Sequence, residues 1–347
     1  MKIRELPFPI SGLTDDKLRT KTLLQWISRH LHAYELIIDS LRHVAGEASY
    51  RRYYRIKSTR PSRSFIIMDS APWLEDNNSF VTVAGLLAFA SISVPAIYEW
   101  DEALGFLLLE DMGKDTLLEL NLRNNCDTVH WHYYQAIDTL LEIQLKAQPD
   151  RLPTFSLELM LQEMELFIHW HLNQNLCTYL KGELQDEIAA CFDLIAQKNQ
   201  SIAQVFVHRD YRPGNLIVSV DRQKISVLDF QDAVKGPITY DLVSLMWDSF
   251  HCWDDKFITQ MVFYYWSTAV TKKLPVPPTF SEFEDHIYWT CLQRHLRVIG
   301  IFARLGIREG KTRYLKEIHR FNNYLTSRKS HDKRIQPLID LLNRIHV

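Results

Sequence analysis

The sequence predicts an α+β protein, with strands in its first third and helices in most of the remainder. Its 347 residues are enough for two parts that each bury a core. Short apolar segments run as far as Glu110 and indicate strands, whereas beyond Thr116 apolar residues recur at intervals of three and four, which is typical of helices. Strands followed by helices are the order that an α+β fold shows.

The composition indicates an ordinary globular protein, because 46% of the residues are hydrophobic and 24% are charged. A formal net charge of -2 argues against a general nucleic-acid surface. Five scattered cysteines without a C-x-x-C pair fit reduced thiols in a cytoplasm. The first residues lack the apolar core of a signal peptide, and Pro95 interrupts the most apolar run, residues 81–98. We therefore expect a cytoplasmic monomer with neither nucleic acid nor membrane as a partner.

The strand-rich part begins after a helix that we expect from Thr14 onward. Residues 43–56 indicate a strand, a tight loop and a second strand. In this loop Gly46 allows a ligand to approach the backbone, and Ser49 keeps the loop small. Such a loop can cover nucleotide phosphates with its N–H groups, although a plain hairpin explains one glycine equally well. Further strands are expected at residues 65–68 and 105–110, with a helix at residues 79–90 between them.

The remainder of the chain carries several helical patterns. The first has a stripe of large apolar side chains that we expect to be buried: Trp131, Tyr134, Ile137, Leu140, Leu141 and Leu145. A second helix begins near Ser156 and ends at a polar break, residues 173–175. Three more are expected at residues 257–269, 282–305 and 312–324. The histidine pairs at positions 130/132 and 169/171 would point apart on a helix, so we do not expect zinc there.

Residues 205–232 contain the side chains that indicate a chemical function. The sequence His-Arg-Asp at 208–210 is followed by Asn215, and an apolar run then leads to Asp229. Phosphoryl transfer from a nucleotide requires this spacing, because one carboxylate meets the acceptor hydroxyl while an amide oxygen and a second carboxylate hold Mg²⁺. Residues 216–228 indicate a hairpin, which brings Asn215 and Asp229 to the same end of two neighbouring strands.

On this interpretation Asp210 is the catalytic base, and Asn215 and Asp229 are the magnesium ligands. We expect His208 to brace the loop rather than react, because the neighbouring carboxylate already provides the base. An Asp in a Pro-Gly loop is usually only a turn residue, but two spaced elements joined by a hairpin favour the catalytic interpretation. Asp241 either bonds the N–H groups of the catalytic loop and supports the Asp210 turn, or caps the helix that follows.

With these residues in view, the chain resembles the aminoglycoside phosphotransferase and choline kinase family, which has the protein-kinase-like fold. Within it, the chain looks most like the bacterial sugar kinases that phosphorylate N-acetylmuramate and N-acetylglucosamine at C1. The resemblance covers nearly the whole chain and rests on seven stretches: GEASYRRYYR (46–55), IMDSAP (67–72), GFLLLED (105–111), VHRDY (207–211), LDFQDAV (228–234), GPITYDLVSL (236–245) and QRHLRVIGIFARL (293–305).

The resemblance implies a bilobal fold, with a small antiparallel-sheet lobe at residues 1–111 and a larger, mainly helical lobe at residues 112–347. It implies ATP and Mg²⁺ as cofactors, with ATP beneath the Gly46 loop and the acceptor sugar against the helical lobe. The nucleotide-binding residues that we expect are Gly46, Ser49, Arg52, Arg55, Glu110 and Met112, and the substrate-binding residues are Asp232 and Arg294. The implied activity is that of a sugar kinase in cell-wall sugar recycling.

Two departures from the family pattern affect these expectations. The third strand, residues 65–69, lacks the lysine that pairs with phosphates in many kinases, so we expect Arg52 or Arg55 to supply the positive charge. In the catalytic loop, the Arg-Pro-Gly sequence at 212–214 is closer to the broad family than to the sugar kinases. This second departure leaves the acceptor open.

Charge helps to narrow the choice of acceptor. A site for polycationic aminoglycosides needs an acidic wall, whereas residues 294–304 carry arginines with few carboxylates, which suits a neutral or anionic sugar. Aminoglycoside, choline and homoserine kinases are the alternatives among enzymes. The alternative of another class is a pseudokinase, a nucleotide-binding protein with weak catalysis. The absent lysine favours a pseudokinase, and the retained base and metal ligands oppose it.

Overall fold

The computed structural model describes residues 13–44, 50–123, 126–219, 224–248, 253–327 and 332–345. Contacts divide the chain into two units, of which the first comprises Met1–Val81 and Pro95–Met112 and the second comprises Thr82–Val94 and Gly113–Val347. The boundary expected from the sequence, after residue 111, would place residues 82–94 in the first unit. Contacts assign them to the second unit instead. Strand pairing explains this grouping, because Ser93 forms a bridge with Ser226 and its carbonyl accepts a hydrogen bond from Val227 N at 2.8 Å.

The first unit is an antiparallel sheet with a helix on one face. Its strands lie in the order β1-β2-β3-β5-β4, and β5 is therefore an interior strand. The bounds are α1 Leu13–Tyr34, β1 Leu36–Val44, β2 Arg52–Ser58, β3 Ser64–Asp69, β4 Ile97–Asp101 and β5 Phe106–Glu110. The helix α2, Asn77–Phe89, connects this sheet to the early segment of the second unit.

Apolar side chains of α1 cover one face of this sheet. Trp26 and Ile27 of α1 form a buried cluster with alternate residues of the strands, among them Phe65 and Ile67 of β3 and Phe106 of β5. Alternate residues of a strand point to the same face, so this cluster defines the face that α1 covers. The sheet expected from the sequence is present, and residues 45–49, which include the expected phosphate loop, lie outside the described residues.

The second unit is mainly helical, with two short β-hairpin-like pairs. Its helices are α3 Leu117–Arg123, α4 Cys126–Lys146, α5 Leu157–Leu166, α6 Glu183–Ser201, α7 Tyr240–Met246, α8 Asp255–Thr271, α9 Phe280–Arg308, α10 Arg313–Ser327 and α11 Gln336–Arg344, with a π-helical segment at Phe167–Asn175. The strands β6 Gln204–Val207 and β9 Val234–Pro237 form one antiparallel pair, and β7 Leu216–Ser219 and β8 Lys224–Val227 form the other.

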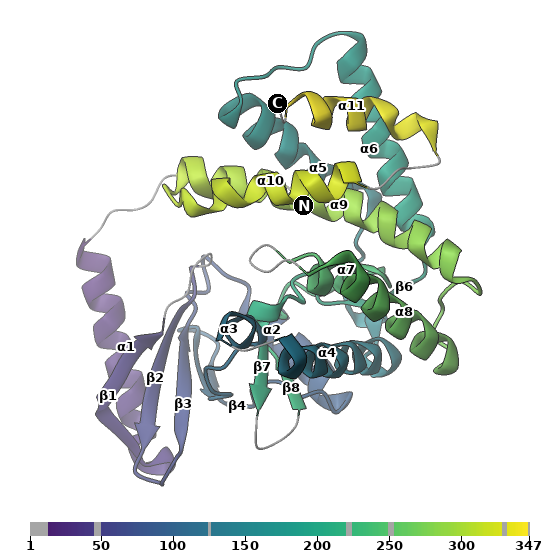
Figure 1. Ribbon diagram of the computed structural model, residues 1–347. Helices are drawn as coiled ribbons and strands as arrows, with labels where there is room; N and C mark the ends of the chain where they lie inside the picture. The colour runs from purple at the N-terminus through teal and green to yellow at the C-terminus, as the bar shows by residue number, and fades with distance from the viewer. Residues whose placement is uncertain are drawn as a thin grey trace. The chain divides into compact units, whose positions relative to one another are not determined.

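The long helix α9 runs through the middle of this unit. It packs against α5, α6 and α10 on one side and against α7 on the other, as Figure 1 shows. Gly300 allows a close contact with α5, because a Cβ at this position would lie only 2.4 Å from the backbone carbon of Leu166. The close contact fixes α9 against α5 and so fixes the side chains that α9 directs toward β6 and α7.

Two details of the helices differ from the sequence-based expectation. Trp131 and Leu145 of α4 are 62% and 45% exposed, so they do not belong to the buried stripe, which instead includes Tyr133, Ile137 and Leu140. About two and a half helical turns separate Trp131 from Leu140, which puts them on opposite sides of the helix. The expected polar break at residues 173–175 is the end of the π-helical segment that continues α5.

The fold class predicted from the sequence is confirmed, with an antiparallel sheet in the first part and helices in the second. Among the residues that the structure describes, no helix combines the length and the apolar character needed to cross a membrane.

Candidate active site

The candidate site is built on the loop between β6 and β7. Leu216 pairs with Val227 across the β7–β8 hairpin, and Leu228 N donates to Asn215 O at 2.9 Å. The hairpin therefore holds Asn215 next to the segment that carries Asp229, on the same end of the two strands. This is the juxtaposition that the spacing of the sequence predicts.

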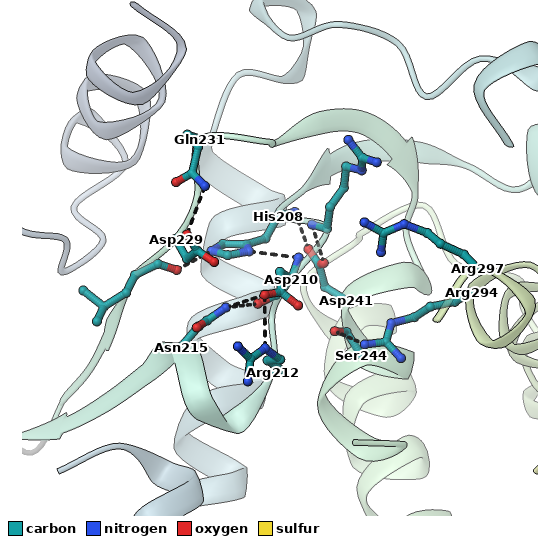
Figure 2. A network of polar contacts seen from close by, with 12 residues as sticks. His208, Asp210, Arg212, Asn215, Asp229, Gln231, Asp241, Ser244, Arg294 and Arg297 are labelled. Atoms are coloured by element: carbon teal, nitrogen blue, oxygen red, sulfur yellow. Dashed lines mark hydrogen bonds and ion pairs between the residues drawn. The ribbon is translucent and has the colours of Figure 1, made fainter. Parts of the chain in front are cut away.

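Asp210 lies at the centre of the site and has two side-chain partners. Its Oδ2 accepts hydrogen bonds from Asn215 Nδ2 at 2.7 Å and from Arg212 Nε at 3.1 Å (Figure 2). Desolvation by the surrounding protein acts to raise the pKa of Asp210, but the positive charges of Arg212 and Arg294 and the hydrogen bond from Arg212 hold the pKa below its usual value. The side chain is 39% exposed and the pKa is lowered, so the carboxyl is ionised at neutral pH.

Asn215 and Asp229 offer oxygen atoms next to this carboxylate. Asn215 uses Nδ2 to donate to both the carbonyl and the carboxylate of Asp210, at 2.9 and 2.7 Å, which turns its Oδ1 away as an acceptor. Asp229 has a left-handed backbone, with φ 62°, and its Oδ1 accepts from Gln231 Nε2 at 3.0 Å. A non-glycine residue in this region costs about 1–3 kcal/mol, and such strain is typical of functional positions.

These atoms suit a magnesium ion that also binds phosphate oxygens. Desolvation and repulsion from the Asp210 carboxylate raise the pKa of Asp229. A divalent cation would relieve the repulsion between the two carboxylates. Among the described residues no group of three or more His, Cys, Asp or Glu forms a self-contained metal cluster. Two protein oxygens with water and phosphate ligands are the arrangement that Mg²⁺ favours at nucleotide sites.

His208 connects the segment that carries Asp210 to the segment that carries Asp229. Its ring is buried, Nε2 donates to Leu228 O at 2.9 Å, and Nδ1 accepts from Asp210 N at 3.2 Å. Both bonds are satisfied by the neutral imidazole with its proton on Nε2. Burial lowers the pKa of His208, although the nearby Asp210 and Asp229 oppose this, and a neutral ring agrees with the two bonds. The histidine thus connects the loop before Asp210 to the segment before Asp229.

Asp241 supports the same loop from α7. Its Oδ2 accepts from His208 N at 2.6 Å and its Oδ1 from Arg209 N at 3.1 Å, and the residue is fully buried. Arg209 has a left-handed backbone, with φ 71°, so these bonds stabilise a strained turn immediately before Asp210. Burial raises the pKa of Asp241 to about 7, against the two backbone N–H bonds that favour the ionised form.

A buried cluster from α5 and α9 lies behind the loop. Glu163 of α5 accepts from Arg209, from Arg297 Nε at 3.0 Å and from Gln293 Nε2 at 3.0 Å. Arg294 is also buried, and its Nη2 donates to Ser244 Oγ at 2.9 Å. Figure 2 shows the side chains of Arg294 and Arg297 extending from α9 toward the loop, on the opposite side of Asp210 from Asn215 and Asp229.

The remaining expected site residues lie at separate positions. Asp232 is exposed in the turn after the Asp229 segment. In the first unit Arg52 pairs with Asp69 at 2.9 Å, and Arg55 pairs with Asp111 at 2.6 Å. Because three positions separate the two arginines on β2, they point to opposite faces of the sheet. Glu110 ends β5 and Met112 follows it at the end of this unit, whereas Gly46 and Ser49 lie outside the described residues.

The sequence-based assignment missed three charged residues. Arg212, the direct partner of Asp210, lies two positions after it in the same loop, and that spacing was the available signal. Glu163 had only one signal, an acidic residue within an apolar helix. Arg51 of the first unit is buried and pairs with Glu75 at 3.2 Å, and nothing in the sequence separated it from the neighbouring arginines.

Comparison with known proteins identifies the family. Residues 40–273 match the phosphotransferase enzyme family. A protein of Pseudomonas aeruginosa named N-acetylmuramate/N-acetylglucosamine kinase is 38% identical over 298 residues, which cover 86% of each chain. A protein of Neisseria meningitidis with the same name is 37% identical over 303 residues, covering 87% of this chain and 89% of that one.

Solved structures show the same fold at low sequence identity. The choline kinase LicA from Streptococcus pneumoniae has a TM-score of 0.63 at 15% identity and covers 89% of this chain and 99% of its own. The ADP-bound aminoglycoside phosphotransferase APH(2'')-Ib has a TM-score of 0.58 at 14% identity and covers 86% of this chain and 96% of its own. The resemblance and the protein-kinase-like fold predicted from the sequence are confirmed, and the chain is a member of the phosphotransferase enzyme family.

Proposed function

We propose that this protein transfers the γ-phosphate of ATP to the anomeric hydroxyl of an N-acetylated amino sugar. The observation that carries the proposal is the ionised Asp210 carboxylate, held by Arg212 and Asn215 at hydrogen-bond distance beside the second carboxylate of Asp229. The sugar class follows from the relatives, which are named N-acetylmuramate/N-acetylglucosamine kinase. The corresponding cellular role is the recycling of cell-wall sugars in the cytoplasm.

Asp210 orients the C1 hydroxyl and accepts its proton. A pKa below the usual value makes this carboxylate a weak base, which suits an acceptor that needs little help. A hydroxyl at C1 of a sugar is a hemiacetal hydroxyl and is more acidic than an ordinary alcohol. The main contribution of Asp210 is therefore position, and a positioned acid or base contributes about 10²-fold to 10⁴-fold to the rate.

Asn215 Oδ1 and the carboxylate of Asp229 would hold Mg²⁺, which when bound neutralises negative charge on the phosphate oxygens. Asp241 holds the backbone immediately before Asp210, and His208 connects Asp210 N to the carbonyl of Leu228, the residue before Asp229. These bonds help to fix the distances among the three oxygen-bearing side chains. In the first unit we assign ATP binding to Gly46, Ser49, Arg52, Arg55, Glu110 and Met112. One of the two β2 arginines would supply the charge that a third-strand lysine supplies in other kinases.

Phosphorus NMR tests the proposal most directly. Incubation with ATP, Mg²⁺ and N-acetylglucosamine is expected to produce an anomeric sugar phosphate, and kanamycin or choline is expected to give none. Arg294 and Arg297 extend from α9 toward Asp210 (Figure 2), and Arg294 has no carboxylate at ion-pair distance among the described residues, which disfavours a cationic acceptor.

The variant Asp210→Asn keeps the shape of the side chain and removes the charge. It is expected to bind ATP as tightly as the wild type, measured by the thermal shift, while turnover falls by about 10²-fold to 10⁴-fold. Turnover at the wild-type rate in this variant would contradict the role of Asp210. Turnover of kanamycin, with none of the sugar, would replace the proposed acceptor.

A further inference from the structure

Arg294 of α9 is a buried cation with most of its donors unused. The side chain is 3% exposed, and Nη2 donates to the hydroxyl of Ser244 at 2.9 Å. Within the part of the chain that the structure describes, Nε and Nη1 are buried and have no hydrogen-bond partner. Buried donors of a charged group are almost always bonded, so two unbonded ones on one side chain are available to a water molecule or to a ligand.

The neighbouring arginines differ because each of them has a carboxylate partner, although Nε of Arg209 is also buried without a hydrogen bond. Glu163 takes both Arg209 and Arg297 as ion-pair partners, the latter at 3.0 Å. Across the described ranges Arg294 has no carboxylate within ion-pair distance, although Asp210 and Asp248 lie near enough for their charges to act on it. Arg209 and Arg297 therefore share one carboxylate and Arg212 pairs with Asp210, whereas Arg294 has no direct counter-ion among the described residues.

The Arg294 side chain extends toward the side of Asp210 where we expect the acceptor sugar, and not toward the side of the phosphates. Figure 2 shows its guanidinium extending from α9 toward Ser244 and the Asp210 loop, whereas Asn215 and Asp229 lie on the far side of Asp210. In phosphoryl transfer the attacking and leaving oxygens lie roughly in line, so the acceptor is opposite the leaving nucleotide. If Asn215 and Asp229 face the phosphates, Arg294 is on the side where the sugar lies.

The unused donors fit a carboxylate. A guanidinium has five N–H groups arranged as two forked edges, and each edge matches the two oxygens of a carboxylate. One edge is formed by Nε and Nη2, and the other by Nη1 and Nη2. Ser244 accepts one of the two Nη2 hydrogens, so one of the two edges keeps both of its hydrogens. Because a single neutral hydroxyl tethers the guanidinium, it can pivot toward Asp210 without breaking an ion pair.

We propose that Arg294 binds the carboxylate of an anionic acceptor sugar and so sets the preference of the enzyme for acidic over neutral amino sugars. This inference rests on the proposed function. N-acetylmuramate carries a lactyl ether at C3, and this ether ends in a carboxylate. N-acetylglucosamine has a hydroxyl at C3 instead. An arginine edge already shielded from water holds such a group strongly, because little further desolvation is needed.

The experiment is a cycle that removes the arginine and the carboxylate separately. Wild type and Arg294→Met are assayed with N-acetylmuramate, with its methyl ester and with N-acetylglucosamine. In the wild type, kcat/KM for the methyl ester is expected to be lower than for the acid by about tenfold to a hundredfold. Arg294→Met is expected to lose the same factor with the acid, mainly through KM, and less than about threefold with the other two sugars.

The thermal midpoint of Arg294→Met distinguishes a role of Arg294 in binding the sugar from a role in stabilising the fold. Replacing an unpaired buried cation by an apolar side chain of similar length leaves the thermal midpoint unchanged or raises it, whereas loss of a structural arginine lowers it. The matched control is Arg308→Met, which removes an exposed arginine from the same helix and is expected to keep both activities. The ester and acid comparison in the wild type needs no variant, so a poorly folded Arg294→Met protein still leaves a decisive measurement.

The outcomes keep the two proposals apart. Equal kcat/KM for acid and ester in the wild type, or an equal loss on all three sugars in Arg294→Met, overturns the role of Arg294 while N-acetylglucosamine turnover still supports the kinase. If the wild type phosphorylates none of the sugars, the proposed function fails and this inference fails with it. A loss confined to the carboxylated sugar supports both.

Discussion

Replacement of Asp241 by Asn should change how the stability of the protein depends on pH. Asp241 has a pKa of about 7 in the folded protein, against 3.8 for an ordinary Asp, because its burial disfavours the charge. The folded state therefore holds the proton more tightly than the unfolded chain. As pH rises from 3.8 toward 7 the unfolded chain gives up this proton first, and the contribution of Asp241 to stability falls.

The size of the effect follows from the two pKa values. At about 1.36 kcal/mol per unit, the contribution of this carboxyl falls by roughly 2–3 kcal/mol between pH 5 and pH 8. Asn does not titrate, so Asp241→Asn lacks this dependence. The free energy of unfolding of the wild type, minus that of the variant, is expected to fall by this amount between the two pH values.

Urea denaturation at pH 5 and pH 8 measures the difference. Asp193→Asn, which replaces an exposed carboxyl on α6, is the control and is expected to change the free energy of unfolding by less than about 0.5 kcal/mol at both pH values. A wild type and an Asp241→Asn variant with parallel pH dependence would refute the reasoning, because the buried carboxyl would then ionise as it does in the unfolded chain.

Two glycines give further predictions. A Cβ on Gly214 would lie 2.5 Å from Nη1 of Arg212, so Gly214→Ala is expected to move this arginine off the catalytic carboxylate and to lower kcat by about tenfold in a coupled ADP assay. The control is Gly85→Ala, whose Cβ meets open space and which is expected to leave kcat unchanged. An unaltered kcat in Gly214→Ala would contradict the role of the Arg212–Asp210 pair. A Cβ on Gly300 would lie 2.4 Å from the Leu166 backbone, so Gly300→Ala is expected to destabilise the fold by about 1–3 kcal/mol in urea, and an unchanged midpoint would show that α9 can shift without cost.

The sequence determined the fold class and the local geometry of the catalytic loop. The spacing from Asp210 through Asn215 to Asp229 fits a short hairpin, and hairpin register is a local property, so the meeting of these residues could be predicted without the rest of the chain. The same locality made Arg212 predictable in principle. The helices at residues 280–308 and 313–327 also followed from their apolar period, to within a few residues at each end.

The tertiary structure decided everything that depends on residues far apart in the chain. Asp241 reaches the N–H groups before Asp210 only because β6 pairs with β9 and places α7 beside the loop. Whether an arginine is balanced depends on which carboxylate packs against it, and Glu163 balances Arg297 but not Arg294, although the two arginines are three residues apart on one helix. Local sequence patterns constrain only neighbours along the chain, whereas burial and charge pairing are set by packing between distant elements, which is why the unbalanced arginine could be recognised only from the fold.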